Sequence, residues 1–261
     1  MTGKVQGETG VSTINATNII ALDATKVQMT TNSCDAILFR QKQMRKIRPT
    51  RRSVSGFYAF RGETSIQFES TLERDFLIRA EFFLDVLDII SQPAQIPFVA
   101  TNGQTFTYTP DFLVYYRLSA PEYYDCPKPM LVEVKPTEEW KNNWRKWLPK
   151  WKAAWRYAQD MGFEFHIYDE SRIRDQTLEN IRFLERYKRM QFSDEESQGV
   201  VENIRKMGRV PFHYILAQHF IGLCQPQGIA HIWYLLATRQ LECDISRPLN
   251  DFSELWVSAY E

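Results

Sequence analysis

The chain has 261 residues, of which 44% are hydrophobic and 25% are charged. These values are typical of globular domains and exclude a collagen-like, coiled-coil or wholly disordered chain. Thirty-two basic residues balance thirty-two acidic ones, so the net charge is zero. The chain as a whole therefore has no field that attracts nucleic acid or an anionic membrane, and any affinity for a polyanion must come from local clusters or from a partner.

Neither a membrane span nor a secretory leader is expected. The longest apolar run, 229–237, contains His231 and is well short of the roughly 18 residues that a spanning helix needs. The first thirty residues lack the basic start and apolar middle of a leader peptide. The four cysteines form no C-x-x-C pair, which argues against a disulfide framework or a zinc site. We therefore expect a protein of the reducing cytoplasm.

Basic residues gather near the N-terminus, after a stretch without a clear pattern. Residues 1–38 are rich in small polar residues and are predicted to form a flexible arm. Residues 40–61 then hold eight basic residues and no acid. Such a run is either a solvated surface or a patch that faces phosphates, and both interpretations stand. The candidate DNA-binding residues in it are Arg45, Lys46, Arg48, Arg51 and Arg52.

Residues 39–190 have the pattern of an α/β domain. The segment 70–73, Ser-Thr-Leu-Glu, has the form of a capping box and predicts a helix that ends near Leu84. Pro149 breaks the next helical pattern, so that helix is expected only over 150–160. Short apolar or alternating runs rich in β-branched and aromatic residues predict strands at 86–90, 105–117, 130–135 and 163–168.

The last part of the chain is predicted to be mainly helical. A helix is expected at about 177–190, and Ser193 then follows as the N-cap of the next one. Further helices are predicted at 200–207, 211–223 and 227–239, and a hairpin within 241–257. Three helices followed by a hairpin is the order of a winged helix, so we predict a small winged-helix-like domain over 193–261.

The strands carry charged residues in unusual surroundings. Because side chains alternate along a strand, Glu133 and Lys135 project from the same face of strand 130–135. Asp111 is the single acid in a long stretch of Thr, Tyr, Phe and Val. In the preceding helix, Glu73 shares its stripe with apolar Leu77, which predicts that Glu73 faces the core or its rim.

Three carboxylates and a lysine that converge in this way would form an all-oxygen site for a hard divalent cation such as Mg²⁺. Phosphodiester hydrolysis is the chemistry that needs such a site. The metal makes a bound water more acidic and neutralises charge on the phosphate, and the lysine orients the nucleophile or contacts the phosphate. We therefore predict Glu73, Asp111 and Glu133 as metal ligands and, together with Lys135, as the catalytic residues.

Each of these residues also has a purely structural interpretation. Glu73 is the third residue of the capping box and needs no other role. Glu133 and Lys135 can form an ion pair on a solvated sheet face. Asp111, which follows Pro110, can simply begin or bend a strand. The prediction of a catalytic site therefore depends on the ordered set and not on any single residue.

The same set resembles a known family. The segments are Ser-Thr-Leu-Glu-Arg-Asp-Phe-Leu (70–77), Ser-Gln-Pro (91–93), Tyr-Thr-Pro-Asp-Phe-Leu-Val (108–114) and Leu-Val-Glu-Val-Lys-Pro (131–136). They resemble the PD-(D/E)XK restriction-endonuclease-like nucleases and, more narrowly, the TnsA endonuclease subunits of heteromeric transposases. The resemblance covers about 45–170, while 193–261 fits a TnsA-like winged-helix part without a motif of its own.

The resemblance implies a mixed central sheet flanked by helices and Mg²⁺-dependent cleavage, with Mn²⁺ able to substitute. It implies that the non-transferred strand is cut at the 5′ transposon ends. The partners would be transposon-end DNA, a TnsB-like DDE transposase that cuts and joins the 3′ ends, and a TnsC-like AAA+ regulator, in the bacterial cytoplasm with the nucleoid. Some relatives carry Gln where this chain has Glu133.

One further pattern is a stripe of tryptophans, at 140, 144, 147, 151 and 155, interleaved with lysines and arginines. Such a stripe either stacks on nucleic acid or a partner, or places its rings in the core while the cations extend to solvent; the second interpretation is preferred. Two rival functions also stand: a stand-alone nuclease of the same fold, active on DNA alone in repair or defence, and an adaptor that binds DNA or protein without catalysis.

Overall fold

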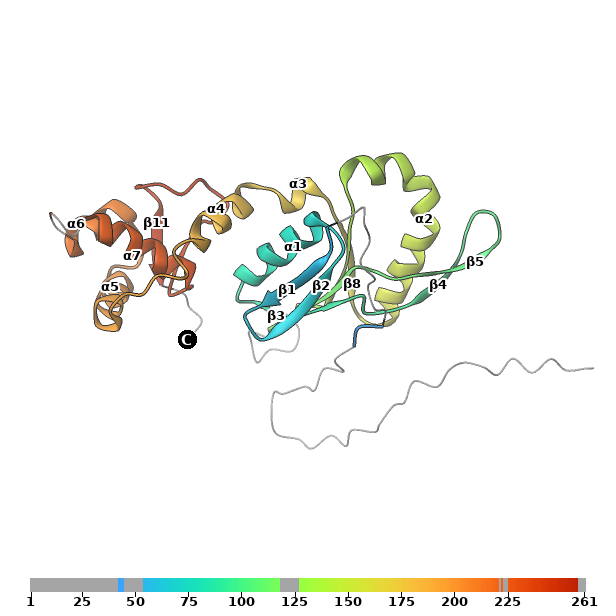
Figure 1. Ribbon diagram of the computed structural model, residues 1–261, viewed down its shortest axis with the longest axis horizontal. Coiled ribbons are helices and arrows are strands. Elements are labelled where there is room, and N and C mark those ends of the chain that lie inside the picture. The colour runs from blue at the N-terminus through green and yellow to red at the C-terminus, as the bar shows by residue number, and fades with distance from the viewer. Residues whose placement is uncertain (1–41, 45–53, 118–126, 221, 223–224, 258–261) are drawn as a thin grey trace, which may run out of the picture. The chain divides into compact units, whose positions relative to one another are not determined.

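The computed structural model describes residues 42–44, 54–117, 127–220, 222 and 225–257 (Figure 1). The predicted arm at 1–38 lies outside these residues. The candidate DNA-binding residues Arg45, Lys46, Arg48, Arg51 and Arg52 also lie outside them.

A four-stranded mixed sheet forms the centre of the first part of the chain. Its strands are β3 (Val86–Ser91), β6 (Phe112–Tyr116), β7 (Met130–Val134) and β8 (Glu164–Tyr168), in the order β3-β6-β7-β8. The neighbours pair antiparallel except β7 and β8, which are parallel. A parallel pair needs a long crossover, and the helix between β7 and β8 supplies it. The α/β class predicted from the sequence is confirmed.

Helices cover both faces of this sheet. Helix α1 (Thr71–Phe82) begins at Ser70, whose side chain accepts a hydrogen bond from the Glu73 backbone N–H, as the capping box predicts. Its apolar residues share a core with Phe112, Val132 and the other side chains of one sheet face. Helix α2 (Thr137–Asp160) packs Ala154 and its neighbours with the opposite face. Both sheet faces are therefore buried.

The predicted strand at 105–117 is wrong as a single element, because it consists of two strands in different sheets. β5 (Thr105–Tyr108) pairs with β4 (Ile96–Val99), a strand that the sequence did not predict, whereas β6 belongs to the central sheet. Pro110 lies in the break and has no N–H to donate to a ladder. The break places Asp111 directly before the first residue of β6.

Helix α2 also corrects the prediction of a helix limited to 150–160, since it starts at Thr137 and runs through Pro149. A proline removes one helical hydrogen bond and bends the helix, and α2 changes direction along its length in Figure 1. Tertiary contacts hold the first turn of α2: Glu170 accepts from the Thr137 backbone N–H at 2.7 Å, and Asp169 accepts from the Trp140 indole at 3.1 Å.

The sequence prediction missed a hairpin before α1. β1 (Gly56–Phe60) and β2 (Thr64–Phe68) pair antiparallel, and Arg61 and Gly62 in the turn both have positive φ. Alternate residues of the two strands, including Phe60 and Ile66, enter the same core as α1. This alternation around an Arg-Gly turn was present in the sequence and could have predicted the hairpin.

The C-terminal part is mainly helical, as predicted. The helices are α3 (Glu170–Ile173), α4 (Gln176–Glu185), α5 (Asp194–Met207), α6 (Phe212–His219) and α7 (Gln225–Ala237). The helix expected to reach residue 190 ends at Glu185, and the one expected to reach 223 ends at His219. The hairpin is confirmed: β10 (Leu241–Cys243) pairs antiparallel with β11 (Glu254–Val257), and β9 (Val210–Pro211) adds a third strand.

No helix among the described residues combines the length and apolar character that crossing a membrane requires. Cys243 is a free thiol, and burial raises its pKa to about 12, so it stays protonated and unreactive. The other three cysteines lie outside the described residues.

Candidate active site

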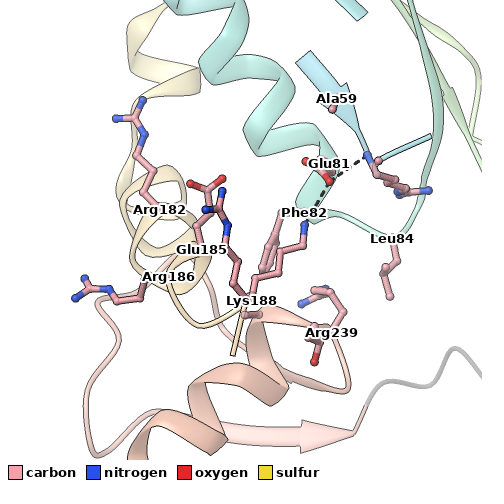
Figure 2. Close-up of a pocket in the computed structure, with 14 residues that line it drawn as sticks. Ala59, Glu81, Phe82, Leu84, Arg182, Glu185, Arg186, Lys188 and Arg239 are labelled. Carbon is pink, nitrogen blue, oxygen red and sulfur yellow. Dashed lines mark hydrogen bonds and ion pairs between the residues drawn. The ribbon is translucent and has the colours of Figure 1, made fainter. Parts of the chain in front are cut away.

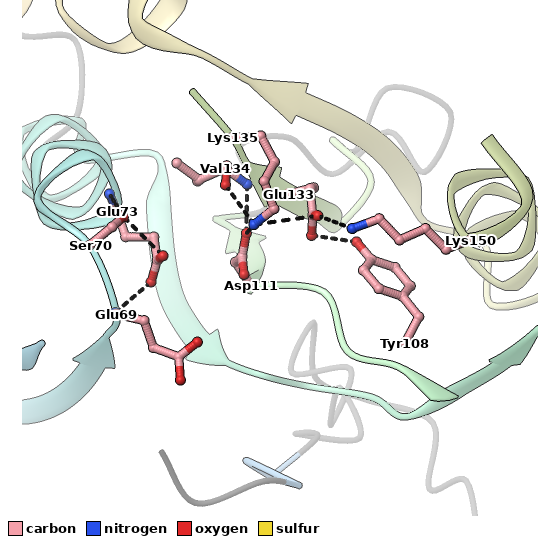
Figure 3. Close-up of polar contacts among 9 residues, drawn as sticks. All are labelled: Glu69, Ser70, Glu73, Tyr108, Asp111, Glu133, Val134, Lys135 and Lys150. Atoms are coloured by element: carbon pink, nitrogen blue, oxygen red, sulfur yellow. Dashed lines mark hydrogen bonds and ion pairs between the residues drawn. The ribbon is translucent and has the colours of Figure 1, made fainter. Parts of the chain in front are cut away.

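Asp111, Glu133 and Lys135 meet where β6 begins and β7 ends (Figure 3). The two strands are antiparallel and Phe112 pairs with Val132, so the residue before β6 lies beside the end of β7. The Asp111 carboxylate accepts a hydrogen bond from the Val134 backbone N–H at 2.7 Å. Lys135 Nζ lies 3.5 Å from an oxygen of Asp111 and 3.5 Å from an oxygen of Glu133. We call these three residues the β6–β7 site.

The acids of this site are largely enclosed. Glu133 is 1% exposed, and the side chains of Asp111 and Lys135 are 14% and 22% exposed. The interpretation of Glu133 and Lys135 as a pair on a solvated sheet face is therefore wrong, because α2 covers that face. Three charged groups in so little water must compensate one another or bind an additional ion.

Burial raises the pKa of Asp111 well above its usual range, and the Glu133 and Glu73 carboxylates raise it further, against the opposing effect of Lys135. Burial alone would lower the pKa of Lys135, but the carboxylates of Asp111, Glu133 and Glu73 outweigh it and raise that pKa. The site therefore holds a lysine that stays charged and an aspartate that favours the proton unless more positive charge is brought near.

Glu133 has two further partners that the sequence did not predict. Lys150 Nζ donates to one of its oxygens at 2.9 Å, and the Tyr108 hydroxyl donates to the other at 2.5 Å. Burial by itself would raise the pKa of Glu133, but Lys135, Lys150 and the Tyr108 hydrogen bond together lower it. Glu133 is thus held as an anion in a fixed orientation.

Lys150 also corrects the preferred interpretation of the tryptophan stripe. Its ammonium group points inward, 4.9 Å from the ring centroid of Tyr108 and 4.8 Å from that of Trp147. Trp151 is buried, but Trp144 and Trp155 are 44% and 54% exposed. The rings are therefore divided between core and surface. No spacing rule identifies Lys150, because its contact with Glu133 depends on how α2 crosses the sheet.

Glu73 lies apart from the other two acids in Figure 3. Its carboxylate accepts from the Glu69 backbone N–H at 2.7 Å and from the Ser70 hydroxyl at 3.0 Å, so it does act in the helix cap. It is also 7% exposed, and its charge acts on the pKa of Asp111 and of Lys135. Glu73 approaches the site from α1, on the opposite face of the sheet. It makes no hydrogen bond or ion pair with Asp111 or Lys135.

The donor set fits a magnesium ion that keeps much of its water. Asp111 and Glu133 offer hard carboxylate oxygens, and Mg²⁺ is commonly bound through one or two carboxylates with several water ligands. Within the described part of the chain, no three acidic, histidine or cysteine side chains lie close enough to hold a metal by themselves. A metal at this site would therefore use two carboxylates with water, or require a shift of Glu73.

Comparison with protein families identifies the chain. The family model described as TnsA-like endonuclease N terminal matches residues 84–170, and the one described as TnsA endonuclease C terminal matches residues 172–245. The chain belongs to the TnsA endonuclease family. The first match contains the whole β6–β7 site, whereas Glu73 precedes it. A comparison with curated proteins found no match. The family assigns nuclease chemistry to a chain whose buried acids and lysine lie in the matched region.

Proposed function

We propose that this TnsA-type chain is the endonuclease subunit of a Tn7-type transposase and that it hydrolyses the non-transferred strand at the 5′ transposon ends. The observation that carries the proposal is the β6–β7 site, where Lys135 lies between two largely enclosed carboxylates. We further propose a restriction-endonuclease-like core around the central sheet. The helices and hairpin of 193–261 would form a winged-helix-like domain.

In the proposed mechanism Asp111 and Glu133 would hold Mg²⁺, and Glu73 would join them as a third acid after a shift toward the site. Bound magnesium would supply a more acidic water and neutralise charge on the phosphate. Lys135 has the charge and position to donate hydrogen bonds to a phosphate oxygen or to orient the attacking water. Lys150 and Tyr108 keep Glu133 ionised and oriented. Burial limits the access of bulk water to these groups.

The proposed partners are transposon-end DNA, a TnsB-like DDE transposase and a TnsC-like AAA+ regulator. Support comes from the family and from the charge balance: a chain with zero net charge has little general affinity for DNA, because phosphate neutralisation supplies most non-specific binding. A nuclease that holds DNA weakly by itself would act only when a sequence-specific partner delivers it.

A strand-specific cleavage assay tests the proposal. Transposon ends labelled at either strand are incubated with the chain alone and with its TnsB-like and TnsC-like partners. We expect cuts only at the 5′ ends and only with the partners present. Efficient cutting of DNA by the chain alone would favour a stand-alone nuclease. A complex that assembles on the ends with no 5′ cuts would favour an inactive adaptor.

A further inference from the structure

A second charged region lies away from the β6–β7 site, at the far end of α1 (Figure 2). A pocket of about 980 Å³ is formed there by the β1–β2 turn, the end of α1, α4 with the residues after it, and the end of α7. Six of its lining side chains are basic and only two, Glu81 and Glu185, are acidic, an excess of four positive charges. The basic ones, which define what we call the basic pocket, are Arg61, Arg182, Arg186, Lys188, Arg189 and Arg239.

Two carboxylates outside the pocket lining reduce this excess to two positive charges, because Asp75 pairs with Arg182 and Glu242 accepts from Arg239 at 3.0 Å. Glu81, whose side chain is 14% exposed, accepts from Lys188 at 3.3 Å and also from the Tyr58 hydroxyl. Arg61 donates to the carbonyl oxygens of Phe83 and Val86, which carry no formal charge. Burial and, after it, the neighbouring Arg117 lower the pKa of Arg61, against the opposing effect of nearby carboxylates.

The residues on the open side of the pocket keep their charge available. Arg186 donates to the Phe183 carbonyl at 3.0 Å, and its guanidinium lies 4.5 Å from the Phe183 ring centroid. These contacts orient Arg186 without neutralising it. Arg186 and Arg189 are both exposed. Five of the six cations are arginines, whose planar forks suit bidentate contacts with phosphate oxygens.

Helix α1 extends from Glu73 to the basic pocket. Glu73 lies in the first turn of α1 and Glu81 lines the pocket near its last turn. Eight residues at about 1.5 Å each separate them by about 12 Å along the helix. Each strand of a DNA duplex carries one phosphate per about 3.4 Å of its axis, so this length corresponds to about three or four base pairs.

We propose that the basic pocket is a phosphate-binding site that holds the backbone of the DNA substrate outside the β6–β7 site. The inference rests on the proposed function, because it takes DNA as the substrate. An acidic protein segment is the alternative occupant. DNA is favoured because the pocket supplies locally the positive charge that a chain of zero net charge lacks as a whole.

Salt-dependent DNA binding tests the site. The full chain carrying Asp111→Ala, to prevent cutting, is compared with the same chain carrying Arg186→Gln and Arg189→Gln, using fluorescence anisotropy with a labelled duplex. The matched control carries Arg205→Gln and Lys206→Gln, two exposed cations at the end of α5 that do not line the pocket. Circular dichroism verifies that all three chains fold.

If Arg186 and Arg189 each contact a phosphate, their loss reduces the slope of log K against log salt by about 1.8, since each contact contributes about 0.9. The affinity deficit of the variant then shrinks about tenfold between about 50 and 200 mM salt. The control pair is expected to leave the slope unchanged. An unchanged slope in the pocket variant, an equal change in the control, or no binding by the parent chain at about 50 mM salt would overturn the proposal.

Two further measurements distinguish DNA from an acidic protein segment as the ligand of the pocket, and the pocket proposal from the proposed function. Poly-glutamate that binds the parent chain but not the pocket variant, while DNA binding is unaffected, would assign the pocket to an acidic protein segment and refute the DNA site. Cleavage by the chain with Asp111 intact is measured in parallel with its partners. If the chain cuts normally and the pocket variant has an unaltered salt slope, the phosphate-binding role of the pocket is refuted and the proposed function stands. If DNA binding depends on the pocket but no cutting occurs, the proposed function is refuted and the phosphate-binding role stands.

Discussion

The β6–β7 site and the basic pocket use the same kinds of side chain in opposite ways. In the site, the carboxylates of Asp111 and Glu133 are largely enclosed, and Lys135 lies between them and compensates their charge. In the pocket, Glu81 is largely enclosed and bonded, whereas Arg186 and Arg189 are exposed. Burial thus decides which charge is left for a ligand. Enclosed carboxylates favour an added cation, and exposed guanidinium groups favour an anion.

Removal of divalent metal is expected to have the largest effect on cleavage, because it acts on the β6–β7 site and not on the basic pocket. We expect complete chelation to abolish cleavage of transposon ends, because the proposed mechanism needs a cation at Asp111 and Glu133. Manganese should restore cutting, and calcium should support DNA binding with little cutting. The measurement is a cleavage time course in the assembled complex with each ion. Cutting that survives full chelation would refute a metal-dependent site.

Substitution of the β6–β7 site residues is expected to have the next largest effect on the cleavage rate. Asp111→Ala and Lys135→Ala should each lower the cleavage rate by at least about 100-fold, since each removes a charge that acts on the reacting phosphate. Folding and complex assembly should stay largely intact. Asp160→Ala, which removes an exposed acid at the end of α2, is the control and should cut normally. A rate near wild type in either site variant would show that the assignment is wrong.

A smaller effect is expected from Lys150, which acts through Glu133. Lys150→Gln removes the charge 2.9 Å from the Glu133 carboxylate, and loss of such an orienting partner typically costs about 10-fold to 100-fold in metal affinity or activity. Lys150→Arg should restore part of the rate by keeping the charge. Lys152→Gln, exposed on the same helix, is the matched control. Equal rates for Lys150→Gln and Lys152→Gln would exclude a positioning role.

The smallest effect on catalysis is expected at Asp75, two residues from Glu73 on α1. Asp75 is 1% exposed and pairs with Arg174 at 2.7 Å and with Arg182, so it links α1 to the end of α3 and to α4. Asp75→Asn should lower the free energy of unfolding by about 2–3 kcal/mol, because the arginines lose a buried partner. The rate per folded molecule should not change. A thermal melt and a cleavage assay on the same sample separate the two properties, and a lost rate with unchanged stability would contradict this role.

Short-range patterns in the sequence predicted a substantial part of the molecule. Ser70 caps α1 as its capping box indicates, because a cap is made by residues within one helical turn. Glu133 and Lys135 share a sheet face because alternation along a strand is a local property. The helices after Ser193 and the final hairpin also follow from local periodicity and turn residues. Each of these features depends on residues that are neighbours in the chain.

Other features were decided only by tertiary structure. Helix α2 begins well before Pro149, and Asp169 and Glu170, distant in sequence, bind its first turn. Lys150 reaches Glu133 because α2 crosses the sheet face that carries the acid. The basic pocket joins four separated segments of the chain, so no window of sequence contains it. The residues of each contact are far apart in the chain, and only the packing of the elements brings them within the few ångströms at which hydrogen bonds and ion pairs act.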